Sequence, residues 1–164
     1  MKEIDIALVS VGGTIKCGLY ENKELFEEIV SNELTLTALP KIFESLLPNP
    51  KQDSKYTDMK INTIYYANGP GSFSALKLTH IFLHTLSLLY EVKLLATSSF
   101  YFTQAKYIKA FGTTYFYEDE NNDIALAYGV DNPQESEFYL PKILDTLRFH
   151  HKIEPLYILP PVQS

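Results

Sequence analysis

The sequence contains no tryptophan, two methionines and a single cysteine, Cys17, among its 164 residues. One cysteine cannot form an internal disulfide. No apolar run reaches the roughly 18 residues that a membrane-spanning helix needs. The first residues, MKEIDIALVSVGGT, lack the charged and then apolar layout of a secretory signal. We therefore expect a soluble protein of the reducing cytoplasm, with no membrane partner.

Long basic runs and familiar catalytic motifs are missing as well. The formal net charge is -6, so the chain by itself lacks the positive surface of a nucleic-acid binder. We expect contact with RNA only through a partner. The patterns HExxH, G-x-x-x-x-G-K-[ST] and G-x-S-x-G do not occur, which argues against a zinc protease, a Walker-type phosphate loop and a serine-hydrolase elbow.

Apolar and aromatic residues are plentiful. Apolar residues make up 46% of the chain, and twelve tyrosines and ten phenylalanines are present. Such a composition can build a large aromatic core. The length favours one domain, or one lobe with a small appendage.

The first half of the chain reads as strands followed by a helix. Residues 4–11 and 14–20 flank Gly12 and Gly13 and predict a β-hairpin. Residues 25–30 are either a third antiparallel strand or the start of a helix. From Asn32 apolar residues recur at spacings of three and four, which predicts a helix that Pro40 bends or splits. These apolar residues are Leu36, Leu39, Phe43, Leu46 and Leu47.

The next segments predict a strand, a helix and another strand at 61–67, 72–90 and 92–97. Such a crossover places the two strands in parallel. Beyond them we expect a helix at 98–111, a hairpin of strands 113–118 and 124–130 around an acidic tip, a short helix within 133–151 broken near Pro141, and a final strand at 155–159.

The turn NGPGS at 68–72 joins the first of these strands to its helix. Gly69 and Gly71 allow backbone angles that other residues disfavour, and Ser72 or Ser74 can cap the helix. Gly69, Gly71 and Ser72 are therefore candidates for an anion site at a helix start. The alternative is a tight connection without a ligand.

Several motifs together resemble the bacterial TsaB family, formerly called YeaZ or glycoprotease-like, which assists threonylcarbamoyladenosine formation on tRNA. "GPGSFSALK" resembles that family's GPGSFTGLR signature, and "VKLLATSSF" resembles the strand that follows it. "NELTLTALPKIFESLL" is similar to the family's H-S-x-x-L-L-P-x-I helix, and "PLYILPPV" to its C-terminal strand.

The resemblance implies an α/β lobe of the ASKHA class, the actin-like and ribonuclease H-like architecture, with a mixed five-stranded sheet at 1–100. A shortened second lobe would occupy 101–164. Ser10 stands where active members carry an aspartate, and the family's second-lobe D-A-R segment is missing. Without an acidic hairpin or a full opposing lobe, a metal-bound nucleotide has little to hold it. We therefore expect a non-catalytic subunit with no cofactor and no bound metal.

The resemblance also implies partners. TsaB packs two helices against TsaD, its catalytic paralogue, so we expect a heterodimer with a TsaD-like protein, a TsaE-like ATPase in the assembly, and a homodimer in their absence. The expected interface residues are Leu36, Leu39, Phe43, Leu76, Lys77, His80, Leu83 and His84. His80 and His84 share a helix face, but without a third ligand they fit an interface better than a metal site.

Two other functions remain open. One is a diverged ASKHA phosphotransferase that binds nucleotide at Gly12, Gly13 and the GPGS turn. The other is a general protein-interaction module without a role in tRNA modification.

Overall fold

The computed structural model describes residues 2–47, 58–131 and 137–157. Its centre is a five-stranded mixed sheet in the order β3-β2-β1-β4-β5. β1, β2 and β3 are antiparallel neighbours, whereas β4 runs parallel to β1 and to β5. The predicted sheet is therefore confirmed, including the third antiparallel strand. The strands are β1 (Lys2–Val9), β2 (Ile15–Glu21), β3 (Glu24–Ser31), β4 (Met59–Ala67) and β5 (Lys93–Thr97).

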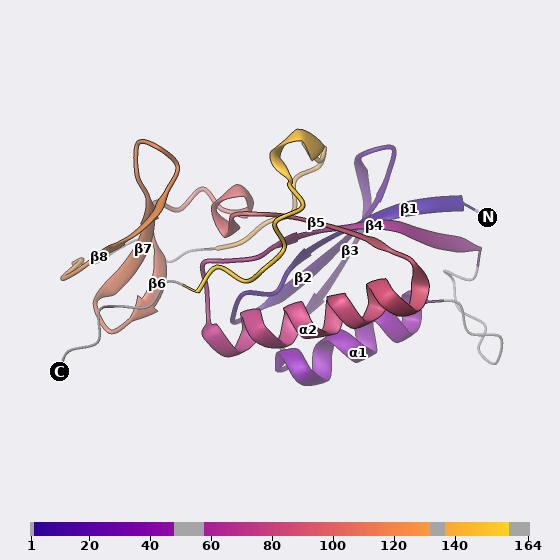
Figure 1. Ribbon diagram of the computed structural model, residues 1–164, viewed down its shortest axis with the longest axis horizontal. Helices are drawn as coiled ribbons and strands as arrows, with labels where there is room; N and C mark the ends of the chain where they lie inside the picture. The colour runs from indigo at the N-terminus through magenta and orange to yellow at the C-terminus, as the bar shows by residue number, and fades with distance from the viewer. Residues whose placement is uncertain (1, 48–57, 132–136, 158–164) are drawn as a thin grey trace.

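Two helices, α1 (Thr35–Leu46) and α2 (Phe73–Tyr90), lie side by side on one face of this sheet (Figure 1). Alternate residues of each strand point to that face of the sheet, and the apolar stripes of the two helices pack against these side chains. α1 is a single helix. It runs unbroken through the exposed Pro40, so the predicted split is wrong, and the alternative of a bend at Pro40 remains a prediction.

The other face of the sheet is covered by the second half of the chain. Leu140, Leu144 and Phe149 are buried there against β1, β2 and β4. These residues belong to an extended segment whose only helical turn within 137–151 is η2 (Thr146–Arg148). The predicted helix within 133–151 is wrong over its described part. Two backbone hydrogen bonds at the start of β3 hold the segment extended. Leu25 N donates to Lys142 O, and Leu144 N donates to Lys23 O.

The predicted helix at 98–111 is also wrong. Residues 99–102 form a short 3₁₀ turn, η1 (Ser99–Phe102), which the Ser98 hydroxyl caps by accepting the Phe100 N–H. The chain then enters β6 (Ile108–Phe111). Ile108 pairs with Phe116 of a strand further along the chain. This pairing with the next strand overrides the local helical pattern.

A second, three-stranded sheet has the order β6-β7-β8, with β7 (Thr114–Glu118) and β8 (Ile124–Ala127) antiparallel. It confirms the predicted hairpin around the acidic tip. The sheet stands at one end of the molecule, and β8 is its outer strand (Figure 1).

The last described residues return to the end of the large sheet. Tyr66 donates its hydroxyl hydrogen to Ile153 O, and Leu156 N donates to Asn68 O. Residues 155–157 form no strand, and the remainder of the predicted strand at 155–159 lies outside the described residues. The division at residue 100 remains a prediction, as does the assignment of the later residues to a shortened second lobe.

Candidate functional site

The GPGS turn is built against the turn between β1 and β2. A Cβ atom on Gly71 would lie 2.4 Å from Val11 O, so only glycine fits this approach. The Ser72 N–H donates to the same carbonyl at 2.7 Å. Gly69 has φ +126°, in the region that favours glycine. The two turns that the sequence singled out therefore meet.

A pocket of about 760 Å³ opens beside the contact between the two turns. The lining includes Gly12, Gly13, Gly71 and Ser72 from the two turns, and Lys109 of β6 and Glu137 from the second half of the chain. Lys16 of β2 adds a second cationic side chain. The pocket thus combines a glycine-lined wall with two lysines.

The three anion-site candidates do not have equal access to this pocket. Gly71 and Ser72 line it, whereas Gly69 is buried. Gly69 O accepts the Ser99 N–H, and a Cβ atom on Gly69 would lie 3.0 Å from Leu156 Cβ. Ser72 precedes α2, but its hydroxyl makes no capping bond and lies 3.3 Å from the Ser74 hydroxyl.

Ser10 is inside the protein rather than on the pocket wall. Its side chain is 1% exposed, and the Thr79 hydroxyl of α2 lies 2.9 Å from the Ser10 hydroxyl and donates to the Ser10 carbonyl. This position therefore links β1 to α2. Glu137 is the single carboxylate of the pocket lining in the described part of the chain.

The helical layer places the eight expected interface residues in two groups. Leu36, Lys77 and His84 are exposed, and His80 is half-buried. The other four, Leu39, Phe43, Leu76 and Leu83, are buried in the chain's own core, so they are unavailable to a partner. Their spacing of threes and fours marks the stripe that faces the sheet.

Several exposed apolar residues, Leu36 among them, lie on α1 and α2 outside the buried stripes. Phe73, Ile81 and Leu88 of α2 are 53%, 52% and 72% exposed, and Leu36 of α1 is 70% exposed. On a helix of 3.6 residues per turn, Phe73, Ile81 and Leu88 fall within one quarter of the circumference, together with Lys77 and His84. We call the set Phe73, Ile81, Leu88 and Leu36 the outer apolar surface. Its α2 members recur at spacings of eight and seven residues, and this spacing is the signal in the sequence that they share one helix face.

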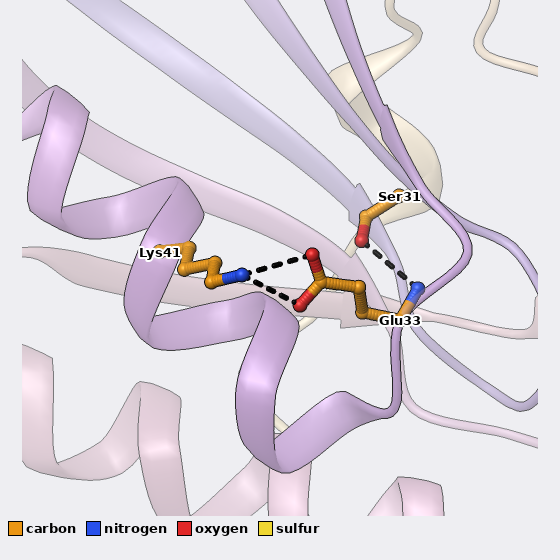
Figure 2. Close-up of polar contacts among 3 residues, drawn as sticks. All are labelled: Ser31, Glu33 and Lys41. Atoms are coloured by element: carbon orange, nitrogen blue, oxygen red, sulfur yellow. Dashed lines mark hydrogen bonds and ion pairs between the residues drawn. The ribbon is translucent and has the colours of Figure 1, made fainter.

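Charges next to α1 are paired with each other. Lys41 Nζ lies 2.9 and 3.0 Å from the two carboxylate oxygens of Glu33, and Ser31 Oγ accepts the Glu33 N–H (Figure 2). An exposed ion pair of this kind adds little stability.

His80 and His84 lie next to each other, with ring centroids 6.0 Å apart. The buried Nδ1 of His80 has no hydrogen-bond partner. Across residues 2–47, 58–131 and 137–157, no group of three or more His, Cys, Asp or Glu is arranged to hold a metal. Within these same ranges no helix is long and apolar enough to cross a bilayer.

Three protein side chains in the interior, one thiol and two phenols, have pKa values that burial raises. Burial raises the pKa of the Cys17 thiol to about 12, so it stays protonated. Burial also raises the pKa of Tyr20 and Tyr66. Each of these phenols donates to a backbone carbonyl, Pro141 O and Ile153 O respectively, so they hold the C-terminal segment on the sheet.

No protein-family model and no curated protein sequence matches the chain. Among solved structures, the fold is similar to YeaZ from Pseudomonas aeruginosa, with a TM-score of 0.53 and 15% identity over 77% of this chain. The matched part covers 64% of that YeaZ chain, less than two thirds of its length. A second structure is described as an uncharacterized protein with similarity to peptidase YEAZ from Pseudomonas aeruginosa. Its TM-score is 0.55 at 15% identity, and the match covers 82% of this chain and 71% of that one. The chain therefore has the YeaZ-like α/β fold that the sequence motifs predicted.

Proposed function

We propose that this chain is a TsaB-like accessory subunit of the complex that forms N6-threonylcarbamoyladenosine at position 37 of tRNA. It binds a TsaD-like catalytic subunit, works in an assembly with a TsaE-like ATPase, and contacts tRNA only indirectly. The fold and the GPGS turn support this family assignment.

The observation that carries the proposal is the outer apolar surface on the helical layer. Ile81 and Leu88 of one α2 face and Leu36 of α1 are mostly exposed, and Phe73 of the same α2 face is 53% exposed although its ring packs on Tyr157. Apolar surface gathered in this way usually marks an interface. The partner packs its own helices on α1 and α2, and two copies of this chain use the same surface when the partner is missing.

Features of the pocket argue against a catalytic role. Phosphate-bound Mg²⁺ is held by carboxylates, but the hairpin position next to the pocket carries Ser10, which is buried and bonded to Thr79. The pocket lining supplies one carboxylate, Glu137, within the described residues. We therefore assign the protein a supporting role, without chemistry of its own.

Reconstitution tests the proposal. The cognate TsaD-like protein, the TsaE-like ATPase and unmodified tRNA are incubated with ATP and threonylcarbamoyl donor, with and without this chain. We expect turnover of modified adenosine to depend on the chain. Equal turnover in both reactions would contradict the proposal and leave a general interaction module as the better description.

The pocket also supports a second candidate, a nucleotide-binding phosphotransferase. Its glycine-lined wall and its lysines, Lys16 and Lys109, suit a phosphate group. Titration with ATP and magnesium, followed by thermal unfolding, separates the two candidates. A saturable rise in melting temperature that Lys109→Ala removes would favour the enzyme, because a ligand that binds only the folded state stabilises it.

A further inference from the structure

The outer edge of β8 has no partner strand within the part of the chain that the structure describes. Its four residues, Ile-Ala-Leu-Ala at 124–127, are all half-buried and carry no charge. Natural sheet edges are usually protected by charges, proline or a covering segment. The edge of β3 shows both kinds of protection, since it carries glutamates and is bonded by residues 142–144. Among the residues that the structure describes, the edge of β8 shows neither, so it can accept another strand.

The side chains next to this edge form a step. Ala125 and Ala127 of β8 lie opposite Tyr117 and Tyr115 of β7. The Tyr107 ring packs edge-on against both tyrosines, at centroid distances of 6.4 and 6.2 Å. Opposed residues share one face of a sheet, so small alanines lie beside tall aromatic rings. Bulky apolar side chains on an added strand would fill the space above the alanines.

Charge beside the edge decides which end of the added strand should be basic. The tip that precedes β8 contains Glu120 and Asp123, both exposed and without an ion pair among the described residues. The lysines of this region, Lys106 and Lys109, lie at or next to β6, on the far side of β7. In the antiparallel pattern of this sheet, the C-terminal end of an added strand lies beside Asp123.

We propose that the edge of β8 binds an extended peptide segment of another protein as a fourth strand. The segment has bulky apolar residues at alternate positions, followed by lysine or arginine at its C-terminal end. Backbone hydrogen bonds provide affinity, whereas the step and the acidic tip provide specificity. β8 lies in the small sheet at one end of the molecule, away from α1 and α2 (Figure 1), so this inference does not depend on the proposed role in tRNA modification.

A display library of random seven-residue peptides tests the proposal with the full chain as bait. The wild type is compared with Ala127→Lys, which places a charge in the step, and with Leu147→Lys, a charge-matched control at a residue that is 93% exposed. We expect the wild type and the control to enrich peptides with alternating bulky residues and a basic C-terminal end. Ala127→Lys should lose at least tenfold in binding, and Asp123→Asn should lose the preference for basic ends.

Hydrogen exchange of the saturated complex supplies a readout specific to strand addition. Alternate amides within 124–127 should become protected. A melting curve confirms that Ala127→Lys folds, and Ala125→Lys replaces it if it does not. Equal peptide binding by wild type and edge variants, absence of any enriched peptide, or unchanged exchange at 124–127 would overturn the proposal. Self-association of the wild type that Ala127→Lys abolishes would assign the edge to a second copy and also overturn it.

Discussion

Replacing Gly71 with alanine tests the contact that builds the candidate pocket. The new Cβ atom would lie 2.4 Å from Val11 O and 2.7 Å from Val11 Cβ. Both atoms belong to or adjoin the backbone, so a side-chain rotation cannot relieve the clash. Overpacking of this kind costs about 1–3 kcal/mol, and separation of the loops also removes the hydrogen bond from Ser72 N to Val11 O, worth about 0.5–1.5 kcal/mol.

We therefore expect Gly71→Ala to lower the free energy of unfolding by about 2–4 kcal/mol. Urea unfolding followed by circular dichroism measures this change, and an unchanged m-value would show that the unfolding transition is comparable. Gly13→Ala is the matched control, because Gly13 has φ +71° and no neighbouring atom within 4 Å of the place that an added methyl group would take. This substitution should lower the free energy of unfolding by only about 1–2 kcal/mol, which is the cost of placing alanine in the left-handed conformation. A Gly71→Ala protein within about 0.5 kcal/mol of the wild type would refute the close approach of the two turns.

Three further predictions concern the interior. Phe43→Ala should lower the free energy of unfolding by about 3–5 kcal/mol in urea titrations, because Phe43 is buried in the core between α1 and the sheet; a loss below about 1 kcal/mol would place this residue on the surface instead. Burial raises the pKa of Asp5, although the carboxylate accepts a hydrogen bond from Thr63 N. The folded state therefore binds a proton at Asp5 more readily than the unfolded state does. As a result, the free energy of unfolding falls as pH rises above about 4. Asp5→Asn, which keeps an acceptor for Thr63 N, should therefore melt higher than the wild type at pH 7, with a difference that shrinks toward pH 4; a lower melting temperature at pH 7 would contradict the burial cost. Cys17 should react with a thiol reagent such as dithionitrobenzoate only in denaturant, since its thiol is fully buried with a pKa of about 12. Rapid labelling of the native protein would show that the reagent reaches β2 in the folded state.

The large sheet and its helices could be predicted because local patterns and tertiary contacts agree there. β1 alternates between two buried faces, and α2 begins directly after a turn whose glycines and serine favour a strand-to-helix change. The pairing of β4 with β5 follows from the helix between them.

The second half of the chain could not be predicted in the same way because its structure depends on distant residues. Leu140 and Leu144 are four apart, which fits a helix but equally fits two inward positions of an extended strand. The edge of β3 decides between the two by bonding the backbone at 142 and 144. The residues that determine this pairing lie more than 100 positions apart in the sequence, so local patterns do not reveal it.

The candidate site was predicted in part for a related reason. Periodicity identified apolar positions on α1 and α2 but did not say which side faces the sheet. Leu39 and Leu83 were therefore expected at an interface although they are core residues, and Phe73 and Leu88 were not among the expected interface residues although they are exposed. The pocket joins β2, the GPGS turn and β6, and β6 was expected to be helical.

The central claim is that the outer apolar surface binds a larger, TsaD-like relative. Burial of Ile81 and Leu88 on docking should contribute about 1–1.5 kcal/mol each, given that they are 52% and 72% exposed in the free chain. Isothermal titration of the cognate TsaD-like protein with the double variant Ile81→Ser and Leu88→Ser tests this directly. Leu147→Ser serves as the exposed control outside the helical layer. We expect the double variant to bind roughly 30- to 150-fold more weakly while the control binds as the wild type does; equal affinity for all three proteins, or no binding by the wild type, would contradict the account.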